Sequence, residues 1–225
     1  MRKSILALTA AAAALLPLSV LSVASAAPAA THDVLTTGKV GGTNVNVKAV
    51  LQAGLAPKSS VVIADGSTTL TCKSSTFTVK VTKNPKAKGT SDESLTKQSF
   101  SKCTAAGPFK SFITSVSVSL AKPPYKTTVS DKKGDPVTVS GAKSKVVVVT
   151  NIIGTLTCYY SGKTVTGSAS NKHQTISFSK QKLTLASGSS SSCSMLSKTS
   201  EFSATYGPVV DTSVKGKSKP HVFVN

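Results

Sequence analysis

The chain has 225 residues and a formal net charge of +19, with 27 Lys and Arg against 8 Asp and Glu. Arg2 is its one arginine and there is no Trp, so it lacks the guanidinium groups and most of the stacking rings that specific nucleic-acid readers use. We therefore expect no specific nucleic-acid binding. The lysine charge predicts solubility and a diffuse, salt-screened attraction to anionic surfaces.

The first 26 residues have the pattern of an export signal. Arg2 and Lys3 precede an apolar run at residues 5–16, and an Ala-Ser-Ala triplet at residues 24–26 supplies the small side chains of a cleavage site. Pro17 interrupts the apolar run short of the roughly 20 residues that a bilayer span needs. The sequence predicts a signal peptide over residues 1–26, and a mature protein without a membrane span that is secreted to the medium or the cell wall.

Four cysteines follow, and two of them end the same string. Thr-Leu-Thr-Cys closes at Cys72 and again at Cys158, and Cys103 and Cys193 come later in turn. In an exported protein an even number of separated cysteines indicates disulfides, and four cysteines allow three connectivities. The repeat favours Cys72–Cys103 and Cys158–Cys193. Because no cysteine pair has zinc-site spacing and no His lies near one, we expect no metal and no cofactor.

Alternating apolar and polar residues predict β-strands along the mature chain. In residues 77–82, Phe77, Val79 and Val81 are expected to face a core and Lys80 the solvent. Further strands are expected at residues 45–47, 116–120, 125–130, 137–140, 145–150, 176–178, 183–185 and 222–224. Residues 132–136 are expected to form a hairpin loop, and residues 90–98 a short helix.

Repeated strings indicate an internal duplication. Besides the two Thr-Leu-Thr-Cys strings, Ser-Phe-Ser-Lys occurs at residues 99–102 and 177–180, although the spacing differs between the two copies. Two related β units, residues 27–130 and 131–225, would produce this pattern, and so would chance in a chain rich in Ser, Thr, Val and Lys. The fold class that we expect is all-β, a disulfide-stapled antiparallel sandwich or barrel.

Several strings together resemble those of a known group of proteins. They are Leu-Thr-Cys at residues 70–72, Asn-Pro at 84–85, Ser-Phe-Ser-Lys-Cys at 99–103, Thr-Ile-Ser-Phe at 175–178, Phe-Ser-Ala-Thr-Tyr-Gly-Pro-Val at 202–209 and the terminal Val-Phe-Val-Asn. The combination resembles uncharacterised secreted proteins of actinobacteria and covers most of the mature chain. The resemblance implies export and an all-β build, and it implies no activity, cofactor or site residue.

Catalytic motifs are missing from the sequence. It has no Gly-x-Ser-x-Gly elbow, no His-Glu-x-x-His and no Walker loop. His32, His173 and His221 are separated in the chain, and each is expected to be a surface residue rather than a general base. No catalytic residue is therefore nominated.

The few acidic residues nominate no site either. Asp92 and Glu93 are neighbours, and on a strand they would point to opposite faces. Asp131 and Asp135 flank the expected hairpin loop, where turn chemistry accounts for them. Distant carboxylates could still converge into a glycosidase pair.

Tyr206, before Gly-Pro at residues 207–208, has two interpretations. The ring could be offered to a ligand at a binding tip, or the residue could form a structural corner in which its hydroxyl bonds to nearby backbone. We favour the corner.

The function that we expect is that of a non-enzymatic secreted β protein, which associates electrostatically with anionic cell-envelope polymers or with a protein partner. Two alternatives stay open. One is a secreted hydrolase whose site is assembled from sequence-distant residues, with His173 and His221 as the first to test. The other is a secreted inhibitor that presents residues 187–194 on a rigid scaffold.

Overall fold

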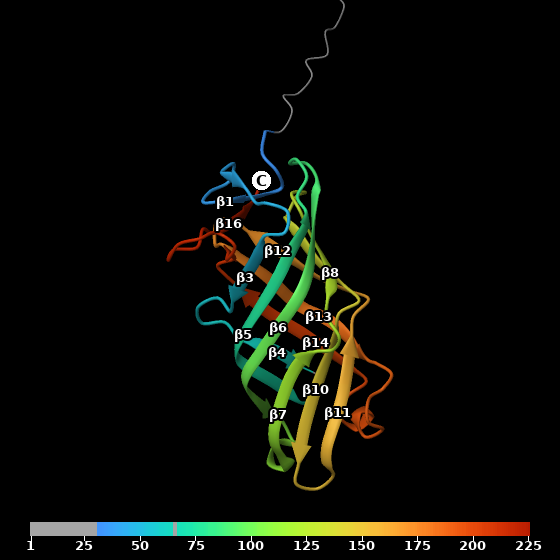
Figure 1. Cartoon of the computed structure of the whole chain (residues 1–225). Coiled ribbons are helices and arrows are strands. Elements are labelled where there is room, and N and C mark those ends of the chain that lie inside the picture. Colours follow the sequence, from blue (N-terminus) through green and yellow to red (C-terminus); the bar gives the residue numbers. More distant parts are fainter. Residues whose placement is uncertain (1–30, 65–66) are drawn as a thin grey trace, which may run out of the picture.

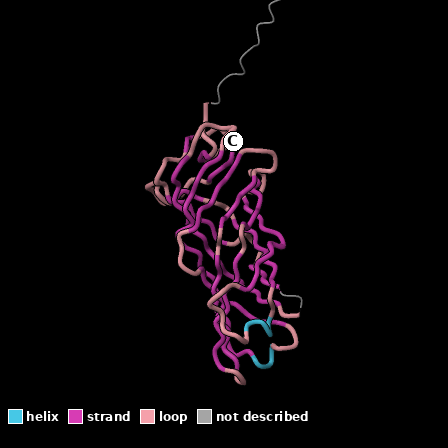
Figure 2. Tube along the Cα trace, turned by 90° about the vertical axis from the view of Figure 1, so that its right-hand side faces the viewer, coloured by secondary structure: helices cyan, strands magenta, loops and turns pink. Residues whose placement is uncertain are grey.

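The computed structural model describes residues 31–64 and 67–225, so the expected signal peptide lies outside the described residues. These residues fold almost entirely as β-structure (Figures 1 and 2). The strands are β1 (Leu35–Thr37), β2 (Thr43–Asn44), β3 (Val50–Gly54), β4 (Val61–Ala64), β5 (Thr69–Lys83), β6 (Thr90–Ala106), β7 (Ile113–Leu120), β8 (Tyr125–Ser130), β9 (Pro136–Ser140), β10 (Lys143–Thr150), β11 (Gly154–Ser161), β12 (Thr164–Ser170), β13 (Thr175–Leu185), β14 (Thr199–Tyr206), β15 (Val210–Asp211) and β16 (Val222–Val224). Two helical turns, η1 (Lys110–Phe112) and α1 (Cys193–Leu196), lie at the end of the molecule opposite the C-terminus (Figure 2). No described helix has the length and hydropathy of a membrane span.

Eight antiparallel strands close into a barrel. Their order is β12-β9-β8-β6-β5-β4-β14-β13, and β13 pairs with β12 to complete the ring. The expected all-β barrel is confirmed. β4, β5, β6 and β8 belong to residues 27–130 and β9, β12, β13 and β14 to residues 131–225. Both halves thus build one barrel, and their relation by duplication remains a prediction.

Further strands extend the barrel at both ends. Beyond β13 the sheet continues through β11, β10 and β7, while β3 pairs with both β5 and β15. A separate small sheet, β16-β1-β2, contributes Leu35 and Val224 to the interior of the barrel at the end where the C-terminus lies (Figure 1). The long strands β5 and β6, of 15 and 17 residues, run through most of the molecule.

The expected alternation is confirmed in β5, where Phe77, Val79 and Val81 are buried and Lys80 is exposed. The expected hairpin is also confirmed, since β8 and β9 pair on either side of residues 131–135. Two expectations were wrong. Residues 90–98 form the first half of β6 rather than a helix, because β5 and β8 pair with them on both sides. Residues 45–47 lie outside any strand, after the two-residue β2.

A β-bulge in β6 decides which of its side chains enter the barrel. Ser91, Glu93 and Leu95 are buried in strict alternation, but the pairing with β5 then shifts by one residue. An extra residue in a strand reverses the parity of every later side chain. As a result Gln98 and Phe100, and not their odd-numbered neighbours, line the interior.

Both disulfides have the expected pairing. Cys72–Cys103 joins the paired strands β5 and β6, and Cys158–Cys193 joins β11 to α1. In the chain-entropy model a loop of either size stabilises the fold by about 4 kcal/mol. Disulfides of this kind are typical of proteins outside the cytosol.

Candidate functional site

The interior of the barrel holds a cavity of about 140 Å³. Most of its wall is apolar, with many valines, among them Val79, Val129, Val137, Val139 and Val165. An eight-stranded barrel is wide enough for its side chains to fill or for one small ligand, and short β-branched side chains leave the centre empty. A mostly apolar space of this size suits a small organic molecule.

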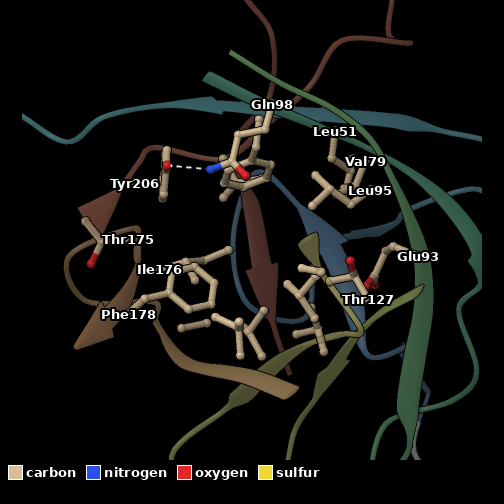
Figure 3. A pocket seen from close by; sticks show the side chains of 18 of the residues that line it. Leu51, Val79, Glu93, Leu95, Gln98, Thr127, Thr175, Ile176, Phe178 and Tyr206 are labelled. Carbon is tan, nitrogen blue, oxygen red and sulfur yellow. Dashed lines mark hydrogen bonds between the residues drawn. The ribbon is translucent and has the colours of Figure 1, made fainter. Parts of the chain in front are cut away.

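One wall of the cavity carries a buried carboxyl group. Glu93 extends from β6 toward the interior (Figure 3) and is only 3 % exposed. Neither of its carboxyl oxygens has a hydrogen-bond partner among the described residues. Burial raises the pKa of Glu93 to about 8 against the lowering effect of the nearby Ser91 hydroxyl, and the negative charge of Asp92 adds a smaller upward contribution. At neutral pH Glu93 is therefore mostly a neutral carboxylic acid.

Thr127 lies beside Glu93. The two residues are direct partners across the β6–β8 pair, which places their side chains on the same face. Thr127 is also buried, and its hydroxyl likewise has no hydrogen-bond partner within the described part of the chain. Three unpartnered polar atoms thus share one position on an otherwise apolar wall.

A second polar group lies across the cavity from Glu93 (Figure 3). The Tyr206 hydroxyl accepts a hydrogen bond of 2.7 Å from the Gln98 amide and lies 3.0 Å from the Ser75 hydroxyl. Its ring meets Phe77 edge to face, with the centroids 5.1 Å apart. The Tyr206 hydroxyl is thus held by two protein contacts at the wall of the cavity.

The corner that the sequence predicts at Tyr206 is not formed. Its hydroxyl bonds to side chains of β5 and β6 rather than to nearby backbone, and the chain continues past Gly207 along β3, where Val210 pairs with Gln52. The residue is 1 % exposed, so its ring is not offered at a binding tip either. At Gly207 φ is +155° and a Cβ atom would lie 2.3 Å from the carbonyl oxygen of Gln174. A glycine is required there because no side chain fits.

The histidines do not assemble into a site. His173 is exposed in the turn between β12 and β13, and His32 and His221 are half-buried near the small sheet. None of them lines the cavity. In the described ranges no three of the His, Cys, Asp and Glu side chains group closely enough to hold a metal ion.

The remaining acidic residues have structural positions. Asp92 is turned outward from Glu93 and pairs with Lys126 at 3.3 Å. Asp131 accepts hydrogen bonds from the backbone of Lys88 and Gly89, which ties the β5–β6 loop to the β8–β9 hairpin. The backbone N–H of Asp135 closes the hairpin turn on Lys132.

Residues 187–194, the candidate inhibitor loop, are tied down along β11. The Ser189 and Ser190 hydroxyls accept hydrogen bonds from the backbone N–H groups of Tyr159 and Thr157, at 2.9 and 3.1 Å. Cys193 adds the disulfide. The segment is held against the sheet rather than presented as a free loop.

No sequence signal marks Glu93 as an inward-facing residue. Residues 90–96 contain one apolar side chain, Leu95, so they show no alternation of apolar and polar residues, and the burial of Glu93 follows from the strand pairing. Gln98 was beyond reach, because its inward direction depends on the bulge.

Lysines cover the outer surface. All 25 lysines that follow residue 26 are exposed or half-buried. In the described ranges two of them form ion pairs, Lys86 with Asp33 and Lys126 with Asp92. The surface is therefore strongly and almost uniformly positive.

No family model, no curated protein and no solved structure significantly matches this chain. The cavity and the surface of the chain itself are therefore the features that bear on its function.

Proposed function

We propose that this protein binds a small, largely apolar molecule inside its barrel, without catalysis. The observation that supports this is the cavity of about 140 Å³ onto which Glu93 and Thr127 turn three polar atoms without protein partners. Buried polar groups are almost always hydrogen-bonded, because an unmade hydrogen bond costs about 1–3 kcal/mol. A ligand that supplies the missing partner would recover that free energy.

The apolar wall supports the same proposal. A barrel built only for stability would fill its centre with larger side chains, since each empty methylene-sized space costs about 1 kcal/mol. Here valines line much of the wall and leave the space open. Binding sites commonly combine an apolar cavity with a few polar groups that orient the ligand.

The proposed site of action is outside the cytosol. The two disulfides are typical of extracellular proteins, and the pattern of residues 1–26 predicts export. A secreted protein with an apolar cavity would carry or sequester a molecule that is poorly soluble in water.

Titration of the mature chain with benzene, an uncharged apolar molecule that a cavity of this size can hold, followed by calorimetry, tests the proposal. We expect saturable binding that the variant Val139→Phe weakens by about tenfold or more, because a phenyl ring at this inward position occupies the cavity. The matched control is Thr138→Phe, on the same strand but with its side chain on the other face. Absence of saturable binding, or equal weakening by both variants, would contradict the proposal.

A second function is favoured by the surface. The uniformly lysine-rich exterior, with two ion pairs among the described residues, supports electrostatic association with anionic cell-envelope polymers. Sedimentation with purified cell wall at low and high salt tests this association. We expect retention that is lost at high salt and is unchanged in Val139→Phe; retention that ignores salt, or none at low salt, would contradict it.

A further inference from the structure

The wall around Glu93 limits what its ligand can be. Glu93 is 3 % exposed and Thr127 is 5 % exposed, and Figure 3 shows both turned toward the cavity. A carboxylic acid has one O–H donor and free acceptor positions, and a hydroxyl adds one donor and two acceptor lone pairs. The ligand must therefore offer a polar atom at this position.

Among the described residues no cation lines the cavity beside Glu93. On the neighbouring strand β5, Val79 lines the cavity, Val81 is buried and Lys80 is exposed. From β8, Thr127 and Val129 line the cavity, while Lys126 points outward to Asp92.

The opposite wall of the cavity, as far as the structure describes it, also carries no cationic side chain. Val137 and Val139 of β9 line it, and besides Glu93 the titratable side chains on its described wall are the phenols of Tyr160 and Tyr206. A charged ligand would meet no opposite charge, apart from Glu93 itself for a cation.

We propose that the cavity takes an uncharged apolar molecule with a hydrogen-bond-accepting oxygen, a carbonyl or a hydroxyl, and that this oxygen accepts the Glu93 O–H beside Thr127. This proposal rests on the proposed function and names its ligand class. Cationic ligands are disfavoured because the chain without residues 1–26 carries a formal charge of +17, the total of +19 less Arg2 and Lys3. Anionic ligands are disfavoured because no described lysine lines the cavity.

The protonation of Glu93 supports the same ligand class. With a pKa of about 8, the side chain is a donor at neutral pH and loses its proton above that value. A ligand oxygen that accepts this proton binds the neutral form, so its affinity is constant below about pH 7 and falls as pH rises through 8. An amine would show the opposite trend.

Three six-carbon probes of similar size test the ligand class: hexane, 2-hexanone and hexylamine. The binding of each to the mature protein is measured by calorimetry at neutral and at alkaline pH. We expect 2-hexanone to bind about tenfold more tightly than hexane at neutral pH, and to lose most of that preference about 1.5 pH units above the pKa of Glu93. Hexylamine should bind no better than hexane.

Two substitutions assign the effect to Glu93. Glu93→Gln keeps a donor that does not ionise, so 2-hexanone should bind it within a few-fold of wild type at both pH values. Glu93→Leu should bind hexane and 2-hexanone alike. The control is Glu201→Gln, an exposed glutamate of β14, which should behave as wild type.

The outcomes separate the two proposals. If benzene and hexane bind but 2-hexanone has no advantage, if Glu93→Leu retains the advantage, or if hexylamine binds best, the ligand class is wrong and the apolar site stands. If neither benzene nor any of the three probes binds, the proposed function fails with it.

Discussion

Two regions of this molecule differ in how completely their side chains fill the interior. The barrel around Glu93 keeps a cavity of about 140 Å³, whereas the region where β10 and β11 face β4 and β5 leaves only about 30 Å³. Both walls are rich in valine and leucine. Composition therefore does not explain the difference.

Strand closure explains it. In a closed ring the number of strands sets the distance between opposite walls, so short side chains cannot draw the walls together. In the other region β7, β10 and β11 lie outside this ring, with β7 beside β6 but outside its hydrogen-bonded order, and Leu196 of α1 also lines the space between them and β4 and β5. Both disulfides lie outside the cavity lining, and Cys158 lines the smaller space. The closed region is thus the one suited to binding, and the other to stability.

The largest expected effect concerns Glu93. Its pKa is about 8 in the folded chain against 4.5 for the ordinary group, so the folded state binds more protons than the unfolded state between these values. Stability that is fully present below about pH 4.5 is therefore lost as pH rises through 8, by up to about 5 kcal/mol. Glu93→Gln should remove this loss, so the difference in unfolding free energy between variant and wild type should grow by that amount from about pH 5 to about pH 9 in urea titrations.

Glu201→Gln, on the exposed face of β14, is the matched control and should show no such growth. If the difference in unfolding free energy between Glu93→Gln and wild type stays constant across this pH range, burial does not raise the pKa of Glu93. The two regions would then differ in packing but not in the ionisation of a buried acid.

Loss of the Cys158–Cys193 disulfide comes next. The double substitution Cys158→Ser, Cys193→Ser should lower the unfolding free energy by about 4 kcal/mol, because the unfolded chain regains the freedom of a loop of 35 residues. At temperatures where the variant stays folded, its affinity for benzene should be unchanged, since neither cysteine lines the larger cavity. A parallel loss of benzene affinity would show that the two regions are not independent.

The smallest effect tests the packing directly with one added methylene. Val137 and Val146 are both 2 % exposed, the first beside the larger cavity and the second beside the smaller. Val137→Leu should raise stability by up to about 1 kcal/mol because there is room for the group, and Val146→Leu should lower it by about 1–3 kcal/mol through overpacking. If thermal or urea unfolding shows equal stability changes for Val137→Leu and Val146→Leu, the two regions do not differ in packing.

Local patterns account for what was predicted from sequence. The alternation at Phe77, Val79 and Val81 identified β5, and the loop at residues 132–136 identified the β8–β9 hairpin. The repeated string before Cys72 and Cys158 indicated the correct disulfide pairing. Each of these features depends on residues close in the chain or on period-two geometry, which any strand obeys.

The cavity depends on contacts that no local pattern contains. The segment at residues 90–98 has a weak helical signal of its own, and pairing with β5 and β8 overrides it. The bulge after Leu95 then turns Gln98 inward, and closure of β12 on β13 leaves Glu93 buried without a partner. The sequence by itself determined most of the strands, the covalent links and the positive exterior, because these follow from side-chain chemistry and neighbouring residues. Only the tertiary structure decided where the empty space lies and which acid faces it, because both depend on how distant strands meet around a ring.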